Sequence, residues 1–434
     1  MIAQICVFAA VGLLFSSTPN YLSQAGYVNI IVGAWYVVIA LLTAVTLLAP
    51  KQQTHTDREA AKRTIKNKRA VFLWSIVYVF MGFVAFLYSG MNELEIRALK
   101  TLVFTSIMLW CTLLMLRDRR TLAAARLALA IVVFWSVLTN SLEFFLPGKF
   151  LVSTSVSLDL GRAAGFYANP NISGTYIVLG TLLSVTALPR RLRLAFFGLA
   201  GYGVLLTFSR SGMLMWAIAL IGLSFKGVFP LNRYLITGIS AALISLFLVM
   251  QFSGTFKDVV ESANLGKGAK ERLQYDEDDA SVQGRLFVAE RSLQLISESP
   301  VYGWGLGSAK SGYAMVQSHN QFLYLGVEQG AIGLIVLLSL FLILFRYPLD
   351  ISAVFVACLF VAFMFNHNML EYPETFVAVA ILCGMNLLRN DIRTPPENPQ
   401  PAPKVPGSTW KKDFRRPKRL ITPLDPAEQF RRQS

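Results

Sequence analysis

Three arginines and one histidine are the residues of this chain whose types could do chemistry together. Arg162 lies in GRAAGFYANPN, Arg210 in TFSRSG, Arg285 in QGRLF and His319 in SHNQFLYLG. Each lies beside or between apolar segments, where an ionisable side chain is a functional candidate by default. The planar guanidinium fork of arginine binds phosphate oxygens two at a time, and histidine can take a proton near neutral pH. The pattern therefore predicts a site that binds a lipid diphosphate and transfers a group from it to an acceptor hydroxyl.

Several polar residues next to these four are secondary candidates. Asn169 and Asn320 either cap helices or bind sugar hydroxyls, and the sequence does not separate these two roles. His367, with Glu371 and Glu374 nearby in FNHNMLEYPE, is a reserve candidate for the base. Each arginine also has an ordinary interpretation, because it could extend to the membrane interface or pair with a nearby carboxylate.

The elements that must position these residues are membrane-spanning helices. The chain has 434 residues, of which 54% are hydrophobic and only 15% charged, whereas soluble domains carry about 25% charged residues. Stretches of about 20 apolar residues are transmembrane helix candidates. The sequence therefore predicts an all-α integral membrane protein. The twelve expected spans are 2–17, 27–48, 70–88, 102–116, 127–146, 172–188, 194–208, 212–229, 234–252, 321–345, 351–365 and 375–388. The pair 194–208 and 212–229 could instead form one long or re-entrant element.

The distribution of Lys and Arg predicts the orientation of these spans. With a cytoplasmic N-terminus, the inside segments hold 28 of the 40 Lys and Arg residues, as the positive-inside rule expects. The C-terminus is then also cytoplasmic, and Arg162, Arg210, Arg285 and His319 all face the outside. The net charge of +15 is explained by this topology and by anionic lipid headgroups, without a nucleic-acid partner.

The chain divides into four regions on this topology. Residues 1–252 hold nine spans, 253–320 form a large outside loop, 321–388 hold three more spans, and 389–434 form a basic, Pro-rich cytoplasmic tail. Within the outside loop, Leu286, Ala289, Leu293 and Ile296 recur at helical spacing, which predicts one or two amphipathic helices that lie along the membrane surface over the spans. GWGLGS at 303–308 predicts a tight turn. The acidic run 276–279 is interpreted as a solvated loop rather than a metal site, and the four cysteines all fall in apolar spans.

The motif series resembles that of the O-antigen ligase and polymerase superfamily. GRAAGFYANPN, TFSRSG, QGRLF followed by PVYGWGLGS, and SHNQFLYLGVEQGAIGL occur in that family's order between residues 161 and 337. The twelve-span layout with a large late outside loop is also similar. None of these motifs is specific by itself, but four in order are.

This resemblance implies a GT-C-like glycosyltransferase of the bacterial inner membrane. A ligase of this kind moves O-antigen polysaccharide from undecaprenyl diphosphate to the lipid A-core at the periplasmic face, without a metal or other cofactor and with inversion of the anomeric centre. The resemblance implies that Arg210, Arg285 and His319 are catalytic. Arg162 matches the family's other outside arginine, and it is expected to bind substrate together with Arg210 and Arg285. Asn169 and Asn320 are substrate-binding candidates from their own positions in the sequence, with helix capping as the open alternative.

Three other functions remain open at this stage. An O-antigen polymerase, or an oligosaccharyltransferase acting on proteins, would share the arginines and the topology. A lipid-linked glycan transporter or flippase would differ in class, since its charges would line a path across the bilayer. The clustering of ionisable residues at one face favours an enzyme.

Overall fold

A computed structural model gives the arrangement of the helices. It describes residues 1–24, 32–50, 58–146, 162–229, 238, 280–310, 320–345, 351–366 and 368–385. Within these ranges every regular element is helical. The first group of elements is α1 (Ile2–Phe15), α2 (Thr18–Gln24), α3 (Val32–Leu48), α4 (Arg58–Leu87), α5 (Glu93–Met115) and α6 (Arg119–Phe145). The second group is α7 (Pro170–Ser184), η2 (Val185–Ala187), α8 (Arg193–Leu206), α9 (Arg210–Phe225), α13 (Ala280–Glu298), α14 (Gln321–Leu344), α15 (Ile351–Phe365), η3 (Met369–Glu371) and α16 (Pro373–Met385).

Eleven of the twelve expected spans coincide with helices of this structure. The ninth, 234–252, lies outside the described residues apart from Gly238. The segments 194–208 and 212–229 form two separate helices, α8 and α9, joined at Thr207–Ser209, so the single-element alternative is wrong. Among the described residues, four helices are long and apolar enough to cross a membrane, and six shorter helices are apolar. Membership of the GT-C fold group stays a prediction.

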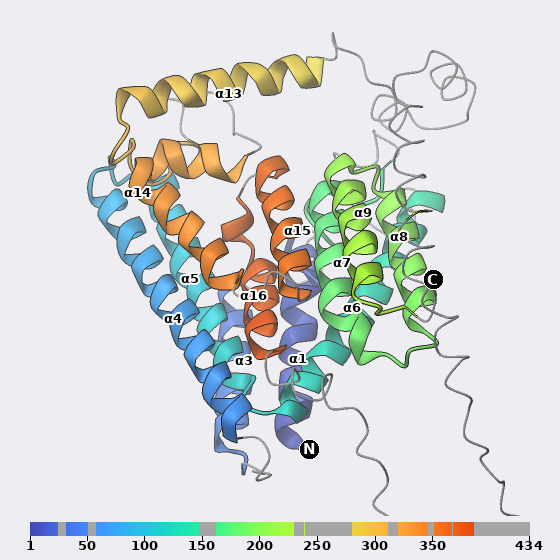
Figure 1. Ribbon diagram of the computed structural model, residues 1–434. Coiled ribbons are helices and arrows are strands. Elements are labelled where there is room, and N and C mark those ends of the chain that lie inside the picture. The colour runs from blue at the N-terminus through green and yellow to red at the C-terminus, as the bar shows by residue number, and fades with distance from the viewer. Residues whose placement is uncertain are drawn as a thin grey trace, which may run out of the picture. The chain divides into compact units, whose positions relative to one another are not determined.

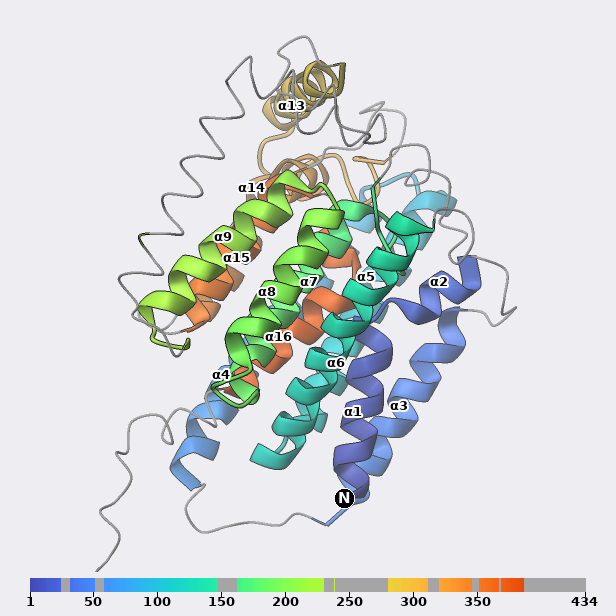
Figure 2. The same ribbon diagram turned by 90° about the vertical axis from the view of Figure 1, so that its right-hand side faces the viewer.

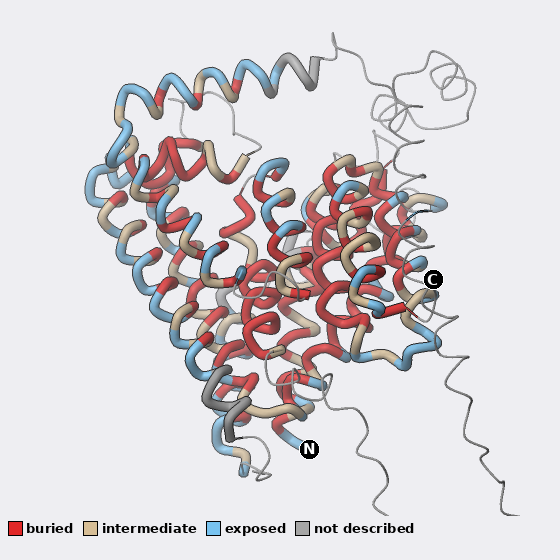
Figure 3. The backbone as a smooth tube through the Cα atoms, in the orientation of Figure 1, coloured by how far each residue is buried: buried red, intermediate tan, exposed pale blue. Residues whose placement is uncertain are grey.

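The helices bear apolar residues on both their buried and their exposed faces, as helices surrounded by lipid do. Apolar residues fill the interior, and many large apolar residues are also exposed. Figure 3 shows exposed positions recurring along α4. On that helix Leu73 and Phe80 are each about 60% exposed (60% and 61%). Outward apolar side chains of this density would be unfavourable in water, but in lipid they contact hydrocarbon. The described residues therefore form a multi-pass membrane protein.

Helices that are far apart in the sequence pack side by side. α1 packs between α6 and α3, α14 packs on α4, α15 on α9, and α16 on α5 (Figures 1 and 2). The largest of the buried side chains on α7 and α16, Tyr176 and Phe376, lie in the same core cluster. Both views show α13 lying across one end of the helices, above α14.

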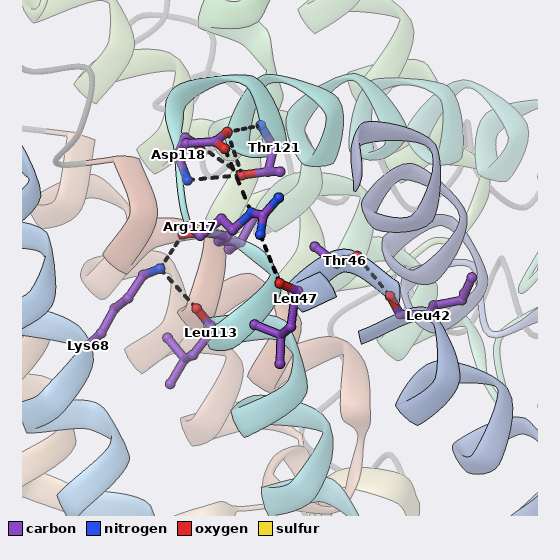
Figure 4. A network of polar contacts seen from close by, with 9 residues as sticks. Leu42, Thr46, Leu47, Lys68, Leu113, Arg117, Asp118 and Thr121 are labelled. Carbon is purple, nitrogen blue, oxygen red and sulfur yellow. Dashed lines mark hydrogen bonds and ion pairs between the residues drawn. The ribbon is translucent and has the colours of Figure 1, made fainter. Parts of the chain in front are cut away.

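At the opposite end, basic side chains bind the carbonyl groups that helix C-termini leave unpaired. The Lys68 ammonium donates to the carbonyls of Leu113 (2.9 Å) and Leu116 at the end of α5 (Figure 4). Arg126 Nε donates to the Leu183 carbonyl at the end of α7 (2.8 Å). Lys68 and Arg126, which the positive-inside rule assigns to the cytoplasmic side, therefore also cap the C-terminal ends of helices. The helix macrodipole favours positive charges at these ends.

The helix expected in the large loop is present, but a different face packs on the protein. Val288, Ser292 and Leu295 of α13 are buried, whereas Leu286 is 53% and Leu293 58% exposed. The prediction of the buried face is therefore wrong: the face that packs on the protein is rotated by part of a turn about the axis of α13 from the expected one. The reason is that α13 packs on α14, where the Ile296 side chain meets Gly326, and this contact sets its rotation.

Candidate functional site

The loop that precedes α7 is bound to the ends of two other helices. The Glu143 carboxylate, near the end of α6, accepts hydrogen bonds from the backbone N–H groups of Ala164 (2.7 Å) and Gly165 (2.6 Å). The Ala163 N–H donates to the carbonyl of Leu206 at the end of α8 (3.1 Å). The motif GRAAGFYANPN is thus a fixed loop that connects α6, α7 and α8.

Arg162 joins this loop to the hairpin that carries Arg210. Its Nε donates to the Thr207 carbonyl and its Nη2 donates to Asn171 Oδ1, both at 2.9 Å. The side chain is buried, with 6% of its residue surface exposed. These bonds direct the guanidinium into the protein and against the backbone three residues before Arg210.

Arg210 is the first residue of α9. Ser209 caps the helix, since its hydroxyl accepts from the Gly212 N–H (3.2 Å), and Phe208 takes a positive φ of 46° to make the turn. Arg210 is half-buried. A helix N-terminus carries a partial positive charge that favours anions. The guanidinium and the helix end therefore act in the same direction on a phosphate.

Asn169 and Asn320 both cap helices. Asn169 Oδ1 accepts from the Ile172 N–H (3.0 Å), and Asn320 Oδ1 accepts from the N–H groups of Phe322 (2.8 Å) and Leu323 (3.2 Å). The structure thus shows one of the two roles left open by the sequence, helix capping. A role for either side chain in binding sugar stays a prediction.

α15 brings the starts of α9 and α14 to the same level. Cys358 Sγ lies 3.4 Å from the carbonyl oxygen of Met215, five residues after Arg210. Asn320 Nδ2 lies 3.9 Å from Met364 Sδ, six residues after Cys358. At a rise of about 1.5 Å per residue, the five-residue offset from Met215 to Arg210 along α9 nearly matches the six-residue offset from Cys358 to Met364 along α15. Arg210 and Asn320 therefore both lie beside the same end of α15.

The glycine-rich motif after α13 is built into a break in α14. Gly330 has φ 59° and ψ −152°, so the helix is interrupted there. Without the break, the N–H groups of Ala331 and Ile332 would bond the carbonyls of Val327 and Glu328. Instead they donate to the carbonyls of Pro300 (2.8 Å) and Val301 (3.4 Å).

The same loop satisfies the carbonyls that the break leaves open. The Val327 carbonyl accepts from the Trp304 N–H (2.8 Å) and the Glu328 carbonyl from the Gly305 N–H (3.1 Å). Gly303, Gly305 and Gly307 all have positive φ, which confirms the expected tight turn in GWGLGS. The motifs PVYGWGLGS and GVEQGAIGL are therefore one structural unit.

A group of charged residues lies beside this break, and of these Glu328 and Lys310 were not singled out from the sequence. Glu328 is 1% exposed and its Oε1 accepts from the Gly307 N–H (2.9 Å). Glu371 on η3 binds both Lys310 and Tyr324. Burial, with the nearby carboxylates of Glu371 and Glu374, raises the pKa of Tyr372, so this phenol stays neutral. Glu328 could have been found from its position inside an apolar span, whereas the Glu371 contacts join distant segments.

Two candidate residues, His319 and His367, lie outside the described residues. The acidic run 276–279, interpreted from the sequence as a solvated loop, also lies outside them. The backbone of Arg285 belongs to α13, but its side chain is not described. Among the residues that the structure describes, no three His, Cys, Asp or Glu side chains are grouped to hold a metal ion.

Comparison with known families gives a match over part of the chain. Residues 195–338 match the model of a family described as O-Antigen ligase. This segment runs from the start of α8 into α14 and includes Arg210, Arg285 and His319. No curated protein matches the chain. This match, over residues 195–338, supports the resemblance to the O-antigen ligase/polymerase superfamily.

Proposed function

We propose that this protein is an O-antigen ligase of the bacterial inner membrane. It transfers O-antigen polysaccharide from undecaprenyl diphosphate to a hydroxyl of the lipid A-core oligosaccharide at the periplasmic face, as a step of lipopolysaccharide biosynthesis. The observation that carries the proposal is the family match across Arg210, Arg285 and His319. The position of Arg210 at a helix N-terminus beside the start of α14 supports it.

In the proposed reaction the acceptor hydroxyl oxygen attacks the anomeric carbon of the donor from the side opposite the diphosphate. The bond between that carbon and the diphosphate oxygen breaks, and undecaprenyl diphosphate leaves with the electron pair. His319 takes the hydroxyl proton, and the anomeric centre is inverted. The arginines stabilise the charge that develops on the diphosphate, so the transfer needs no metal.

The structure supports separate parts for the arginines. Arg210 is half-buried at the start of α9, where the helix end adds to its attraction for phosphate. Arg162 donates two hydrogen bonds within the protein, so its proposed contribution to donor binding includes holding the Arg210 hairpin in place. Arg285 is proposed to reach the donor from α13.

An O-antigen polymerase is the alternative within the superfamily, because it uses the same kind of donor. Transport of a lipid-linked glycan is the alternative of another class. The grouping of Arg162, Arg210 and Asn320 at one end of the described helices favours chemistry at a surface over a path through the bilayer.

A reconstituted assay tests the proposal. Purified protein in liposomes receives undecaprenyl-diphosphate O-antigen and lipid A-core in the presence of EDTA, and a gel resolves the products. We expect glycan-capped lipid A-core from the wild type. His319→Ala should give none, and Arg210→Lys, which keeps the charge but loses the fork, should be slower by roughly 100-fold.

Each other outcome contradicts a stated part of the proposal. Longer lipid-linked glycan without a capped product would identify a polymerase. Loss of activity on chelation would overturn the metal-free mechanism. Neither product from folded protein would overturn the glycosyltransferase assignment.

A further inference from the structure

Arg126 of α6 and Arg193 of α8 meet at one residue of the connection between α7 and α8. The Arg126 Nη2 group donates to the Thr186 hydroxyl, and the Arg193 Nη2 group donates to the Thr186 carbonyl (3.4 Å). Arg190 and Arg191 belong to the same connection and are exposed. This connection lies at the end of the described helices opposite α13 (Figure 1). Four arginines therefore lie where α6, η2 and α8 come together.

The hydrogen bonds of the two inner arginines all go to neutral acceptors. Arg126 Nε donates to the Leu183 carbonyl (2.8 Å), and Arg193 Nε and Nη1 donate to the carbonyls of Leu188 (3.0 Å) and Val228 (3.3 Å). Among the residues that the structure describes, none of the four arginines forms an ion pair with a carboxylate. The cluster therefore has no counter-ion within that part of the chain.

The charge of this cluster exceeds what the nearby helix ends can offset. A helix C-terminus carries about half a negative charge, and the accepting carbonyls lie at or just after the ends of α7 and α9. Two such ends offset about one of the four positive charges. The arginines also repel one another, since the charge of Arg193 acts on Arg126 and that of Arg190 acts on Arg193. An excess of roughly three positive charges therefore favours the binding of an anion.

Arg126 has one amino group left for such an anion. The residue is only 5% exposed, and its Nε and Nη2 groups are bonded within the protein. Its Nη1 group has no acceptor among the described residues, but these residues do not enclose it. Arginine binds phosphate oxygens through adjacent N–H groups. A fixed guanidinium therefore presents one edge to a phosphate from outside.

Apolar side chains beside the arginines indicate what carries that phosphate. Leu192, between Arg191 and Arg193, is 55% exposed, and Phe225 at the end of α9 is 53% exposed. Exposed apolar residues next to cations favour a ligand that offers both hydrocarbon and negative charge. An anionic phospholipid offers both, whereas a soluble phosphate offers only the charge.

We propose that the four arginines Arg126, Arg190, Arg191 and Arg193 form a binding site for the headgroup of an anionic phospholipid. The phosphate binds Arg126 Nη1 and the exposed guanidinium groups, and the acyl chains contact Leu192. The bound lipid supplies the missing counter-charge and stabilises the junction of α6 and α8. This site lies at the opposite end of the helices from Arg210, so the inference goes beyond the proposed transfer reaction and does not depend on it.

Native mass spectrometry of the full-length protein in detergent tests the site. The protein receives cardiolipin, which has two phosphates, or phosphatidylcholine, whose headgroup has no net charge, and lipid adducts are measured on the folded species. We expect the wild type to bind cardiolipin much more tightly. The double variant Arg190→Gln with Arg191→Gln should bind cardiolipin roughly 25-fold more weakly, since each basic residue near anionic lipid contributes roughly fivefold.

A matched control removes the same charge from the other end of the helices. Arg97 and Lys100 are exposed near the start of α5, and Arg97→Gln with Lys100→Gln should keep the wild-type affinity for cardiolipin. An equal loss in this control would mean that net charge, rather than a site, determines binding. Equal binding of phosphatidylcholine and cardiolipin, or an unchanged affinity in the Arg190 and Arg191 variant, would also overturn the proposal.

Thermal unfolding gives a second measurement of the same site. Cardiolipin should raise the unfolding midpoint of the wild type, because a ligand that binds the folded state stabilises it. It should raise the midpoint of the Arg190 and Arg191 variant much less, although both proteins should unfold at the same temperature without lipid. Arg126→Lys, which keeps the charge but loses the fork, should also lose most of the shift. An equal shift by inorganic phosphate would indicate a soluble anion and contradict the lipid assignment.

Discussion

Arg162 has its hydrogen-bonding groups directed into the protein. Replacing it with Met removes the donors that the Thr207 carbonyl and Asn171 accept from. Buried acceptors left without a donor cost about 1–3 kcal/mol each, so we expect Arg162→Met to lower the thermal unfolding midpoint in detergent clearly. Arg97→Met is the control, because Arg97 is 70% exposed and exposed substitutions of this kind change stability by less than about 0.5 kcal/mol. Equal midpoints for the two variants would show that the Arg162 contacts do not stabilise the fold.

Residue type and local context predicted only part of this site. Asn169 and Asn320 could be recognised as cap candidates because each directly precedes an apolar helix, and both cap. The partners of Arg162 could not be predicted, because Thr207 is 45 positions away and belongs to another hairpin. The Lys310–Glu371 pair joins residues 61 positions apart, and no local pattern contains that information.

Among the elements, α14 depends most on a single backbone position. Gly330 has a positive φ, and an added Cβ would lie 2.5 Å from the backbone carbon and oxygen of Val301. Gly330→Ala should therefore separate the glycine-rich loop from the helix break, and lower both stability and transfer. Gly198→Ala is the matched control, since nothing lies within 4 Å of its added Cβ and alanine favours a helix by about 0.5–1 kcal/mol. Thermal unfolding of both variants is the measurement, and an unchanged midpoint for Gly330→Ala would contradict the described break.

The existence of the helices was more predictable than the way their ends meet. Long apolar runs are sufficient to predict a span in lipid, because the bilayer forces backbone groups to bond within the segment. Apolar periodicity could not predict the rotation of α13, because the contact with α14 decides which of its faces is buried. Likewise, VEQGAIG has the composition of a continuous span, and only the loop at 300–305 explains why it is interrupted.

At the scale of the molecule, the described helices have two chemically different ends, and the side that each end faces is a prediction of the charge rule. At one end, Lys68, Arg126 and Arg193 donate hydrogen bonds to carbonyl groups at or just after the ends of helices. The other end carries Arg210, Asn320 and α13. Labelling of single added cysteines with a membrane-impermeant maleimide tests the orientation. The native cysteines at positions 6, 358 and 383 are buried and Cys111 is half-buried, which keeps the background low.

We expect Ser297→Cys, on the exposed face of α13, to react in cells whose outer membrane alone is permeabilised. Arg191→Cys, exposed in the turn between α7 and α8, should react only after the inner membrane is broken. The opposite pattern would place Arg210 and the start of α14 in the cytoplasm, where the proposed donor and acceptor would not meet them. The orientation of the molecule therefore decides whether the chemistry argued from single residues can take place at all.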